Sequence, residues 1–313
     1  MEKSIEASLD FQMIFIVGAP RSGTTWLQAM LASHPEIVTG QETHFFEAIN
    51  EFLKFFNVRK YPRKVGLFAY WSKEKVPSLL ASYFFKFIEP LVKDFSINCP
   101  RYFLEKTPEH TLFIPLISQC FPNAKFIHII RDGRHVVASL LRAAKREAQK
   151  KRLVSMSATT ASLVWKKFVD EARKSRQFLG ASRYFELKYE DLRKDTFNIL
   201  REIFSWLSLS ADKDMLKKII DSCSLEKSRQ TKRFKSIKVA NNDNYSEPEW
   251  FIGSASTSRK NFDLSKLELY KVYDICGDLL KELGYIPEIP YIPLWARILS
   301  SYKIRTFLRM KQV

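Results

Sequence analysis

Short apolar runs alternate with longer segments of helical periodicity along most of this chain. Five of these runs are rich in β-branched and aromatic residues and predict strands, at Gln12–Val17, Glu36–Thr39, Arg101–Lys106, Lys125–Ile130 and Tyr184–Lys188. Runs that are almost wholly apolar, such as QMIFIV at Gln12–Val17, are typical of parallel strands covered on both faces. The pattern therefore predicts a buried sheet.

The segments between these runs have the periodicity of helices. Helices are predicted at Thr24–Ser33, Val76–Asp94, His110–Cys120, Gly133–Arg142 and Ala158–Gly180, and a last one at Ser265–Leu283 that Gly284 caps. Strands that alternate with helices are joined by right-handed crossovers, so the sheet should be parallel. We therefore predict an α/β fold of three layers: a central parallel sheet of about five strands flanked by helices, with a helical C-terminal part.

Three segments depart from this alternation. Lys145–Arg152 is densely basic and is interpreted as a loop, and Arg229–Asn261 is a long polar and aromatic loop of the kind that often forms a lid. The tail Trp295–Met310 interleaves apolar with basic residues. Because no internal repeat or linker is visible, we predict one domain over residues 1–313, with a helical extension over about 285–313.

Charge and composition narrow the classes of function. Of 313 residues, 46% are apolar, and the net charge is +17. This composition excludes a disordered or fibrous protein, and the charge indicates an anionic ligand, nucleic acid or an anionic membrane surface. No nucleic-acid-binding motif accompanies the charge, so we expect no nucleic acid. The basic tail is the feature that would favour peripheral membrane contact.

The cysteines and the N-terminus predict a cytoplasmic protein. Cys99, Cys120, Cys223 and Cys276 have no metal-binding or disulfide spacing and are expected to be reduced and mostly buried. The sequence contains neither an apolar run of about 18 residues nor a signal peptide. A phosphate loop that begins at Gly18 leaves no room for an N-terminal membrane anchor.

Residues Gly18–Thr25 (GAPRSGTT) have the glycine spacing of a Walker A loop, between a predicted strand and a predicted helix. In such loops the backbone N–H groups and the helix N-terminus enclose a phosphate. Thr24 stands where a Walker A loop has Lys, and no acidic residue is clearly placed to hold Mg²⁺. The loop therefore indicates an anion site that disfavours a nucleoside triphosphate.

Two motifs resemble sulfotransferases that use 3′-phosphoadenosine 5′-phosphosulfate (PAPS). PRSGTT at Pro20–Thr25 resembles the family's 5′-phosphosulfate loop, and FIHIIRDGRHVVASLL at Phe126–Leu141 resembles its 3′-phosphate site. GQET at Gly40–Thr43 looks closer to the tyrosylprotein sulfotransferase branch and its bacterial relatives than to the animal cytosolic branch. The resemblance runs from about Phe11 to Leu192. It implies a P-loop-like fold and sulfuryl transfer from PAPS to a hydroxyl acceptor, with release of 3′-phosphoadenosine 5′-phosphate (PAP) and without a metal.

The same resemblance implies a cofactor site with two phosphate-binding parts. The loop residues expected at the 5′-phosphosulfate are Arg21, Ser22, Gly23, Thr24 and Thr25. Arg131 follows a buried strand, where open α/β sheets place ligands, and could grip the 3′-phosphate through two parallel hydrogen bonds. Ser139 could donate its hydroxyl to the same group. The alternatives are a salt bridge between Arg131 and Asp132, and an exposed Ser139.

For the chemical step, Glu42 matches the general base of the tyrosylprotein branch and is our candidate base. His44 is the rival, because animal cytosolic enzymes use a His and because His needs little adjustment of its pKa near neutrality. Lys106, in Glu105-Lys-Thr-Pro, would contact the bridging oxygen or the sulfuryl group, although an exposed Lys paired with Glu105 is the common alternative. Arg21 would share the charge of the leaving phosphate.

Four further residues have weaker assignments. Tyr189 matches a family Tyr near the 3′-phosphate or the adenine, but a core Tyr would fit the pattern as well. Arg259 and Lys260 lie where the family closes a basic lid, although Arg-Lys-Asn replaces the Arg-Lys-Gly of the cytosolic branch. Trp26 could touch the base of the cofactor, but packing of its helix against the sheet is the stronger expectation.

The acceptor stays open between a small molecule, a saccharide, a lipid and a peptide. The aromatic-rich Phe45–Tyr102 region suits an apolar, aromatic or sugar face, whereas the basic Lys145–Arg152 segment suits an acidic peptide or polysaccharide. Two other functions remain as alternatives: a nucleotide or small-molecule kinase that uses the same loop, and a basic module that binds membrane surfaces.

Overall fold

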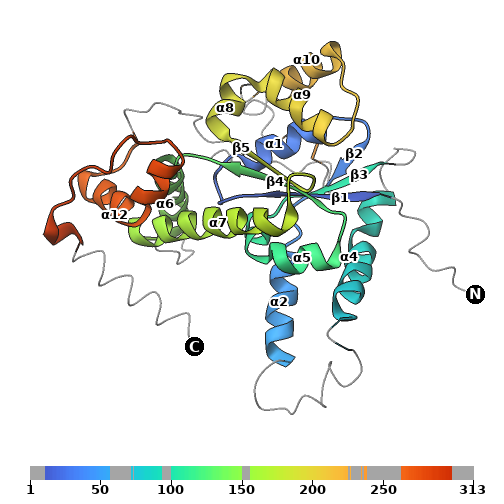
Figure 1. Cartoon of the computed structure of the whole chain (residues 1–313), viewed down its shortest axis with the longest axis horizontal. Helices are drawn as coiled ribbons and strands as arrows, with labels where there is room; N and C mark the ends of the chain where they lie inside the picture. Colours follow the sequence, from blue (N-terminus) through green and yellow to red (C-terminus); the bar gives the residue numbers. More distant parts are fainter. Residues whose placement is uncertain are drawn as a thin grey trace, which may run out of the picture.

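A computed structural model describes residues 11–56, 72, 74–93, 100–149, 156–224, 226, 234, 236–237 and 262–297. At its centre is a sheet of five parallel strands in the order β2-β3-β1-β4-β5 (Figure 1). The strands are β1 (Gln12–Val17), β2 (Ile37–Thr39), β3 (Tyr102–Glu105), β4 (Lys125–Ile130) and β5 (Tyr184–Lys188). The predicted parallel sheet is confirmed.

Helices cover both faces of this sheet (Figure 1). Their bounds are α1 (Thr24–Leu31), α2 (Phe45–Phe56), α4 (Val76–Lys93), η2 (Pro108–Phe113, a 3₁₀ helix), α5 (Ile114–Cys120), α6 (Gly133–Gln149), α7 (Ala158–Leu179), α8 (Tyr189–Lys194), α9 (Thr196–Trp206), α10 (Lys213–Ser222) and α12 (Lys266–Glu282). In Figure 1, α8, α9 and α10 lie above the sheet and α5 and α7 below it. The three-layer α/β architecture is therefore confirmed.

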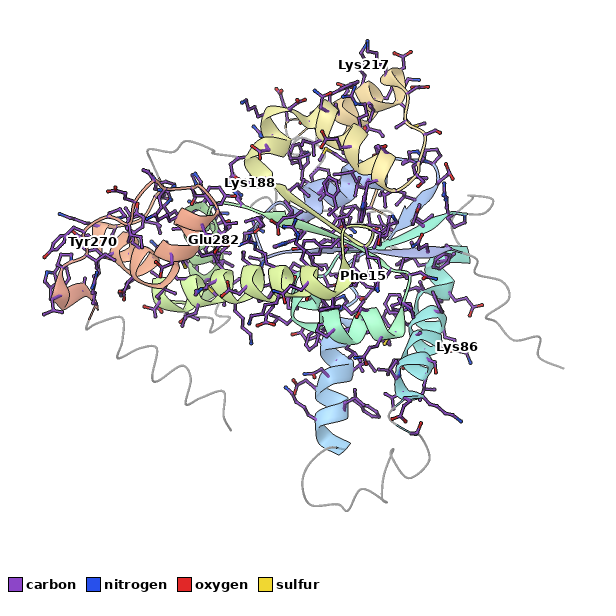
Figure 2. All side chains as sticks on the ribbon, viewed as in Figure 1. Phe15, Lys86, Lys188, Lys217, Tyr270 and Glu282 are labelled. Atoms are coloured by element: carbon purple, nitrogen blue, oxygen red, sulfur yellow. The ribbon has the colours of Figure 1, made fainter. Side chains whose placement is uncertain are left out.

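The alternation of side chains along β1 divides the core between the two faces. Ile14 and Ile16 pack with α1, α9 and α10, whereas Phe15 and Val17 pack with α2, α4, α5 and α7. Figure 2 shows Phe15 near the centre of the molecule, and its side chain is fully buried. A third apolar cluster joins α6, α7 and α12. Burial on both faces explains why the strand runs are almost continuously apolar.

The C-terminal helix is capped as its sequence predicts. Ser265 accepts a hydrogen bond from the Glu268 backbone N–H, and the Glu268 carboxylate accepts one from the Ser265 backbone, which forms a capping box. Gly284 follows the helix with a φ of 73°. Lys188, labelled in Figure 2, donates to the Leu283 carbonyl at 2.5 Å and ties this helix end to β5.

Three predicted segments differ from the structure. Lys145–Gln149 is not a loop but the last turns of α6, because RAAKREAQ contains strong helix formers and no breaker. The helix predicted over His110–Cys120 begins as the 3₁₀ helix η2 and becomes α-helical at Ile114. Residues 285–293 are not helical, since they include Pro287, Pro290 and Pro293, which donate no backbone hydrogen bond; residues 294–297 are helical.

Candidate functional site

The candidate residues follow the carboxyl ends of the five strands. Glu42 follows β2, Lys106 follows β3, the loop Gly18–Thr25 leaves β1, Arg131 follows β4 and Tyr189 follows β5. Because all the strands are parallel, the sheet order places them along one edge in the same sequence. With strands spaced by about 4.8 Å, the ends of β2 and β4 are roughly 15 Å apart. The candidate residues therefore form two groups along this edge, one after β2 and β3 and one after β4 and β5, with the loop between them.

The loop Gly18–Thr25 connects β1 to the N-terminus of α1 and is held by hydrogen bonds. The Gly18 N–H donates to Thr111 Oγ1 at 2.8 Å, and Ser22 N–H donates to the Ala19 carbonyl at 3.1 Å. Ser22 Oγ is buried and has no hydrogen-bond partner among the described residues. An orphaned buried hydroxyl beside a helix N-terminus fits the phosphate of a bound nucleotide. Thr111 contributes to this loop and was missed by the sequence reasoning.

Gly23 makes the close approach of the loop to the start of α8 possible. It caps α1 with a φ of 97°, a conformation that favours glycine. A Cβ atom at this position would lie 2.5 Å from Cδ2 of Tyr189. Thr24, which replaces the Walker lysine, begins α1 and is 3% exposed. Thr25 is the second residue of α1, so both threonines lie at its N-terminus.

The loop and the residues after β4 are in direct contact. Arg131 donates from Nη1 to the Arg21 carbonyl at 3.2 Å, and its guanidinium lies 4.4 Å from the centroid of the Tyr189 ring. Arg21 has a left-handed backbone, φ 72°, and donates from Nε to Ser139 Oγ at 3.1 Å. The structure thus brings Arg21, Arg131, Ser139 and Tyr189 together. Tyr189 is also a buried core residue, so both descriptions of it hold.

This end of the edge is strongly positive. Burial lowers the pKa of Arg21, and the charges of Arg131, Arg142 and Arg146 lower it further. Arg142 and Arg146 lie three and seven residues after Ser139 on α6, hence on the same helix face. Arg142 ended the predicted helix but was not assigned to the site, and Arg146 lay beyond the predicted end. Such a group of guanidinium cations favours a ligand with more than one phosphate.

The alternative partner for Arg131 is excluded by the geometry. Asp132 instead accepts from Arg134, at 2.6 Å between Oδ2 and Nη2. Ser139 is partly buried and in contact with Arg21, and so is not an exposed helix residue.

At the other end of the edge, Glu42 and Lys106 meet. Lys106 Nζ donates to Glu42 Oε1, and the Lys106 side chain is only 3% exposed. The alternative for Lys106, an exposed side chain paired with Glu105, does not hold, because Glu105 is buried and bonded to His110. Burial would raise the pKa of Glu105, but His110 and the hydroxyls of Thr107 and Thr43 lower it to about 2.

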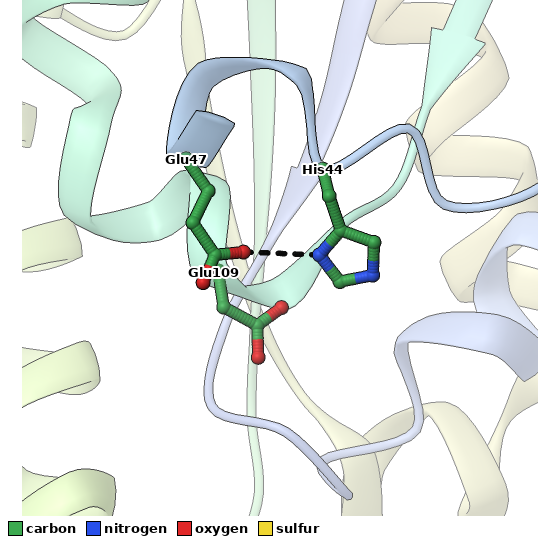
Figure 3. Close-up of side chains that lie close together, drawn as sticks. All are labelled: His44, Glu47 and Glu109. Carbon is green, nitrogen blue, oxygen red and sulfur yellow. Dashed lines mark hydrogen bonds and ion pairs between the residues drawn. The ribbon is translucent and has the colours of Figure 1, made fainter. Parts of the chain in front are cut away.

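His44 lies beside Glu42 in an acidic setting. Its Nε2 is 3.5 Å from Glu42 Oε2. On its other side, Nδ1 is 3.0 Å from Glu47 Oε2, the contact drawn in Figure 3. Partial burial lowers the pKa of His44, but the bond to Glu47 and the charges of Glu109 and Glu42 raise it above its ordinary value. Burial and the charges of Glu42 and Glu47 raise the pKa of Glu109.

Among the described residues, His44, Glu47 and Glu109 also have ligand atoms within 4.8 Å of one another, a spacing that could hold a metal ion but is also common among exposed acidic groups without one. The sequence predicts no metal, and that stays a prediction.

Of the three remaining assigned residues, Trp26, Arg259 and Lys260, the structure describes only Trp26. Trp26 donates from Nε1 to the Cys223 carbonyl at 2.9 Å and packs edge-on against Tyr189 at 5.9 Å, which agrees with a packing role. Arg259 and Lys260 lie outside the described residues. Phe262, two residues after Lys260, is described, and the centroid of its ring lies 4.3 Å from the Arg134 guanidinium.

The described cysteines Cys120, Cys223 and Cys276 are buried free thiols, as predicted; Cys99 lies outside the described residues. Burial raises the pKa of Cys120 and of Cys276 to about 12, so neither thiol is a reactive thiolate near neutrality. No helix within the described part of the chain has both the length and the apolar character to cross a membrane.

Comparison with known proteins gives consistent results. Residues 13–213 match the model of a family described as the sulfotransferase family. Human protein-tyrosine sulfotransferase 1 is 34% identical over 143 residues, which cover 42% of this chain and 34% of the human protein. Protein-tyrosine sulfotransferase 2 of Gallus gallus is 28% identical over 219 residues, covering 65% of this chain and 53% of the relative. The match thus spans about a third of the length of the human relative and about half of the other.

A solved structure extends the likeness to nearly the whole chain. The crystal structure of a mouse sulfotransferase complexed with PAP superposes with a TM-score of 0.56 at 14% identity, covering 97% of this chain and 94% of that one. At that identity the likeness shows a shared fold.

Proposed function

The chain belongs to the sulfotransferase family, and we propose that it transfers the sulfuryl group of PAPS to an acceptor hydroxyl. The observation that carries the proposal is the arrangement along the carboxyl edge of the sheet. The loop Gly18–Thr25, which carries Arg21, lies between Arg131 and Ser139 on one side and a carboxylate–lysine pair, Glu42 and Lys106, on the other. A donor with a 3′-phosphate, a 5′-phosphate and a reactive sulfuryl group needs these three parts in this order.

At the 3′-phosphate, Arg131 and Ser139 would bind the oxygens through a forked guanidinium and a hydroxyl. Both already contact Arg21, the cation inside the loop. At the 5′-phosphate, the backbone N–H of Gly23 and the N-terminus of α1 would bind the oxygens, with the hydroxyls of Ser22, Thr24 and Thr25 beside them. Ser22 Oγ is buried and has no hydrogen-bond partner in the described part of the chain, which supports this assignment.

In the transfer step the acceptor oxygen forms a bond to sulfur while the bond from sulfur to the phosphate oxygen breaks. Glu42 would take the proton of the acceptor hydroxyl, and Lys106 and Arg21 would meet the negative charge that develops on the leaving oxygen. By analogy with phosphoryl transfer, positioning and fixed cations account for most of the catalysis. His44 lies against Glu42 rather than against Lys106, and we assign it to orienting the Glu42 carboxylate.

The first acceptor to test is the phenolic hydroxyl of tyrosine. It is suggested by the names of the curated relatives, which are protein-tyrosine sulfotransferases. Saccharide, lipid and small-molecule hydroxyls are the other acceptor classes. Membrane contact by the basic tail concerns residues that lie largely outside the described part and stays a prediction, as do the cytoplasmic location and the single-domain organisation.

A kinase is the competing use of the same loop, and two contacts argue against it. The acidic residues that follow the core strands nearest the loop are engaged by protein groups: Glu105 by His110, and Asp132 by Arg134. Neither is presented to a magnesium ion, and Thr24 replaces the lysine that would bind a triphosphate.

Calorimetric titration separates the two functions. We expect PAP to bind without added metal at least a hundredfold more tightly than ATP with Mg²⁺, because each charge-assisted phosphate contact contributes about 1.5–3 kcal/mol. ATP with Mg²⁺ binding as tightly as PAP would refute the sulfotransferase proposal.

A further inference from the structure

A buried polar network lies directly behind the loop that carries Glu42. Glu105 ends β3 with 2% of its surface exposed. Its carboxylate accepts from His110 Nδ1 at 2.7 Å, from Thr107 Oγ1 at 2.6 Å and from Thr43 Oγ1 at 2.9 Å. A buried carboxylate is tolerated only when its oxygens are bonded in this way. The network is therefore satisfied inside the protein and has no need of a ligand.

The same groups hold the backbone on both sides of His44. Thr107 Oγ1 accepts from the N–H of Thr43 at 3.1 Å and from the N–H of His44 at 3.4 Å. His110 Nε2 accepts from the N–H of Phe46 at 3.3 Å, which leaves its Nδ1 as the donor to Glu105. Three backbone groups of residues 43–46 are thus fixed by side chains that come from the end of β3 and from η2.

This attachment couples the two candidate catalytic groups. Lys106 stands in the chain between Glu105 and Thr107, and its amino group reaches Glu42, which precedes Thr43. His44 has a left-handed backbone, φ 48°, a conformation that persists only where neighbouring contacts impose it. The network supplies those contacts, so the end of β3 determines where both Glu42 and Lys106 lie.

We infer that Glu105, Thr107 and His110 are positioning residues that set Glu42 against Lys106 for proton transfer, an inference that rests on the proposed function. None of the three touches the place where the substrates would meet; they act through the residue 43–46 backbone. A displacement of about 1 Å in a catalytic group can cost roughly a hundredfold in rate, so the effect of loosening this backbone should be large.

The test compares Thr107→Val with Thr107→Ser in the full chain. Valine removes the hydroxyl that accepts from Thr43 and His44, whereas serine keeps it. With PAPS and a tyrosine-containing peptide, kcat should fall about 10- to 100-fold in T107V and stay within about threefold of wild type in T107S. PAP affinity should be unchanged in both, because the Thr107 hydroxyl bonds to Glu105, Thr43 and His44 and not to the phosphate-binding loop. Thr159→Val is the matched control, since Thr159 is 1% exposed in α7 and its hydroxyl has no partner among the described residues.

Two further measurements keep the inference falsifiable. Amide hydrogen exchange at Thr43 and His44 needs no activity, and we expect it to be about tenfold faster in T107V than in T107S. Thr43→Val, at a partly exposed position, removes a donor to Glu105 with little risk to folding, and should lower kcat in the same direction. Wild-type kcat in both T107V and T43V, or unchanged exchange in T107V, would overturn the inference. Absence of PAP binding in the wild-type protein would instead refute the proposed function.

Discussion

The role of Arg131 can be tested by replacing it with lysine and comparing two nucleotides. Lysine keeps the positive charge but loses the planar fork, so it can offer a phosphate one bond where arginine offers two. One charge-assisted hydrogen bond is worth about 1.5–3 kcal/mol, so a loss of about 2 kcal/mol is expected, or roughly 30-fold weaker PAP binding.

Adenosine 5′-phosphate lacks the 3′-phosphate and serves as the internal reference. Arg131 also supports the loop through the Arg21 carbonyl at 3.2 Å and lies 4.4 Å from the Tyr189 ring, so its replacement could disturb the 5′ site as well. Titrating both nucleotides against both proteins separates these effects. We expect PAP affinity to fall about 30-fold and adenosine 5′-phosphate affinity less than threefold. Arg201→Lys, at an exposed position of α9, is the control for an arginine-to-lysine change elsewhere.

An equal loss for the two nucleotides would refute the reasoning. It would mean that Arg131 supports the loop and does not bind the 3′-phosphate. Isothermal titration calorimetry at fixed ionic strength gives all four affinities, and fixed salt matters because contacts between exposed charges are screened.

Three other changes have defined outcomes. Glu42→Gln should lower kcat by about a hundredfold or more and leave PAP affinity unchanged; a parallel loss of PAP affinity would contradict its assignment as the base. Gly23→Ala should destabilise the protein by about 1–3 kcal/mol in urea unfolding, because the new Cβ would meet the Tyr189 ring at 2.5 Å. The control is Gly180→Ala, which also lies at positive φ but faces open space and should destabilise the protein less. Equal losses of stability in the two variants would contradict the steric argument. The pKa of Glu105 is lowered from 4.5 to about 2, so the ionised carboxylate adds about 3 kcal/mol to the free energy of unfolding above pH 4.5. This contribution is lost as the pH falls towards 2. Acid unfolding of Glu105→Gln should lack that loss, and curves of the same shape for both proteins would disprove it.

The elements that could be predicted are those whose signal is local. QMIFIV and KFIHII became β1 and β4 with the predicted bounds, because a strand covered on both faces must be apolar throughout. The turn at Gly23 could likewise be predicted from glycine spacing between a strand and a helix. The last turns of α6 were mistaken for a loop, since a dense run of positive charge was given more weight than the helix propensity of Ala, Lys, Arg and Glu.

The contacts that join the end of β3 to the segment carrying Glu42 could not be predicted, because they are distant in sequence. Glu105 and Thr43 are 62 residues apart, and Lys106 and Glu42 are 64 residues apart. Each pair meets only because β2 lies next to β3 in the sheet. The sequence suggested Lys106 and Glu42 separately, through resemblance. No feature of the sequence indicated that the Glu105 carboxylate would be buried and bonded to His110, or that Lys106 would therefore pair with Glu42.

The central claim is tested most directly by following the sulfuryl group itself. The full chain is incubated with PAPS and a tyrosine-containing peptide, then with saccharide, lipid and small phenol acceptors, and mass spectrometry records both the acceptor and the nucleotide. We predict an acceptor that gains the mass of one sulfuryl group for each PAP released, and no such product with Glu42→Gln, although that variant still binds PAP. PAPS that stays intact with every acceptor class, in a wild-type protein shown to be folded, would contradict the account.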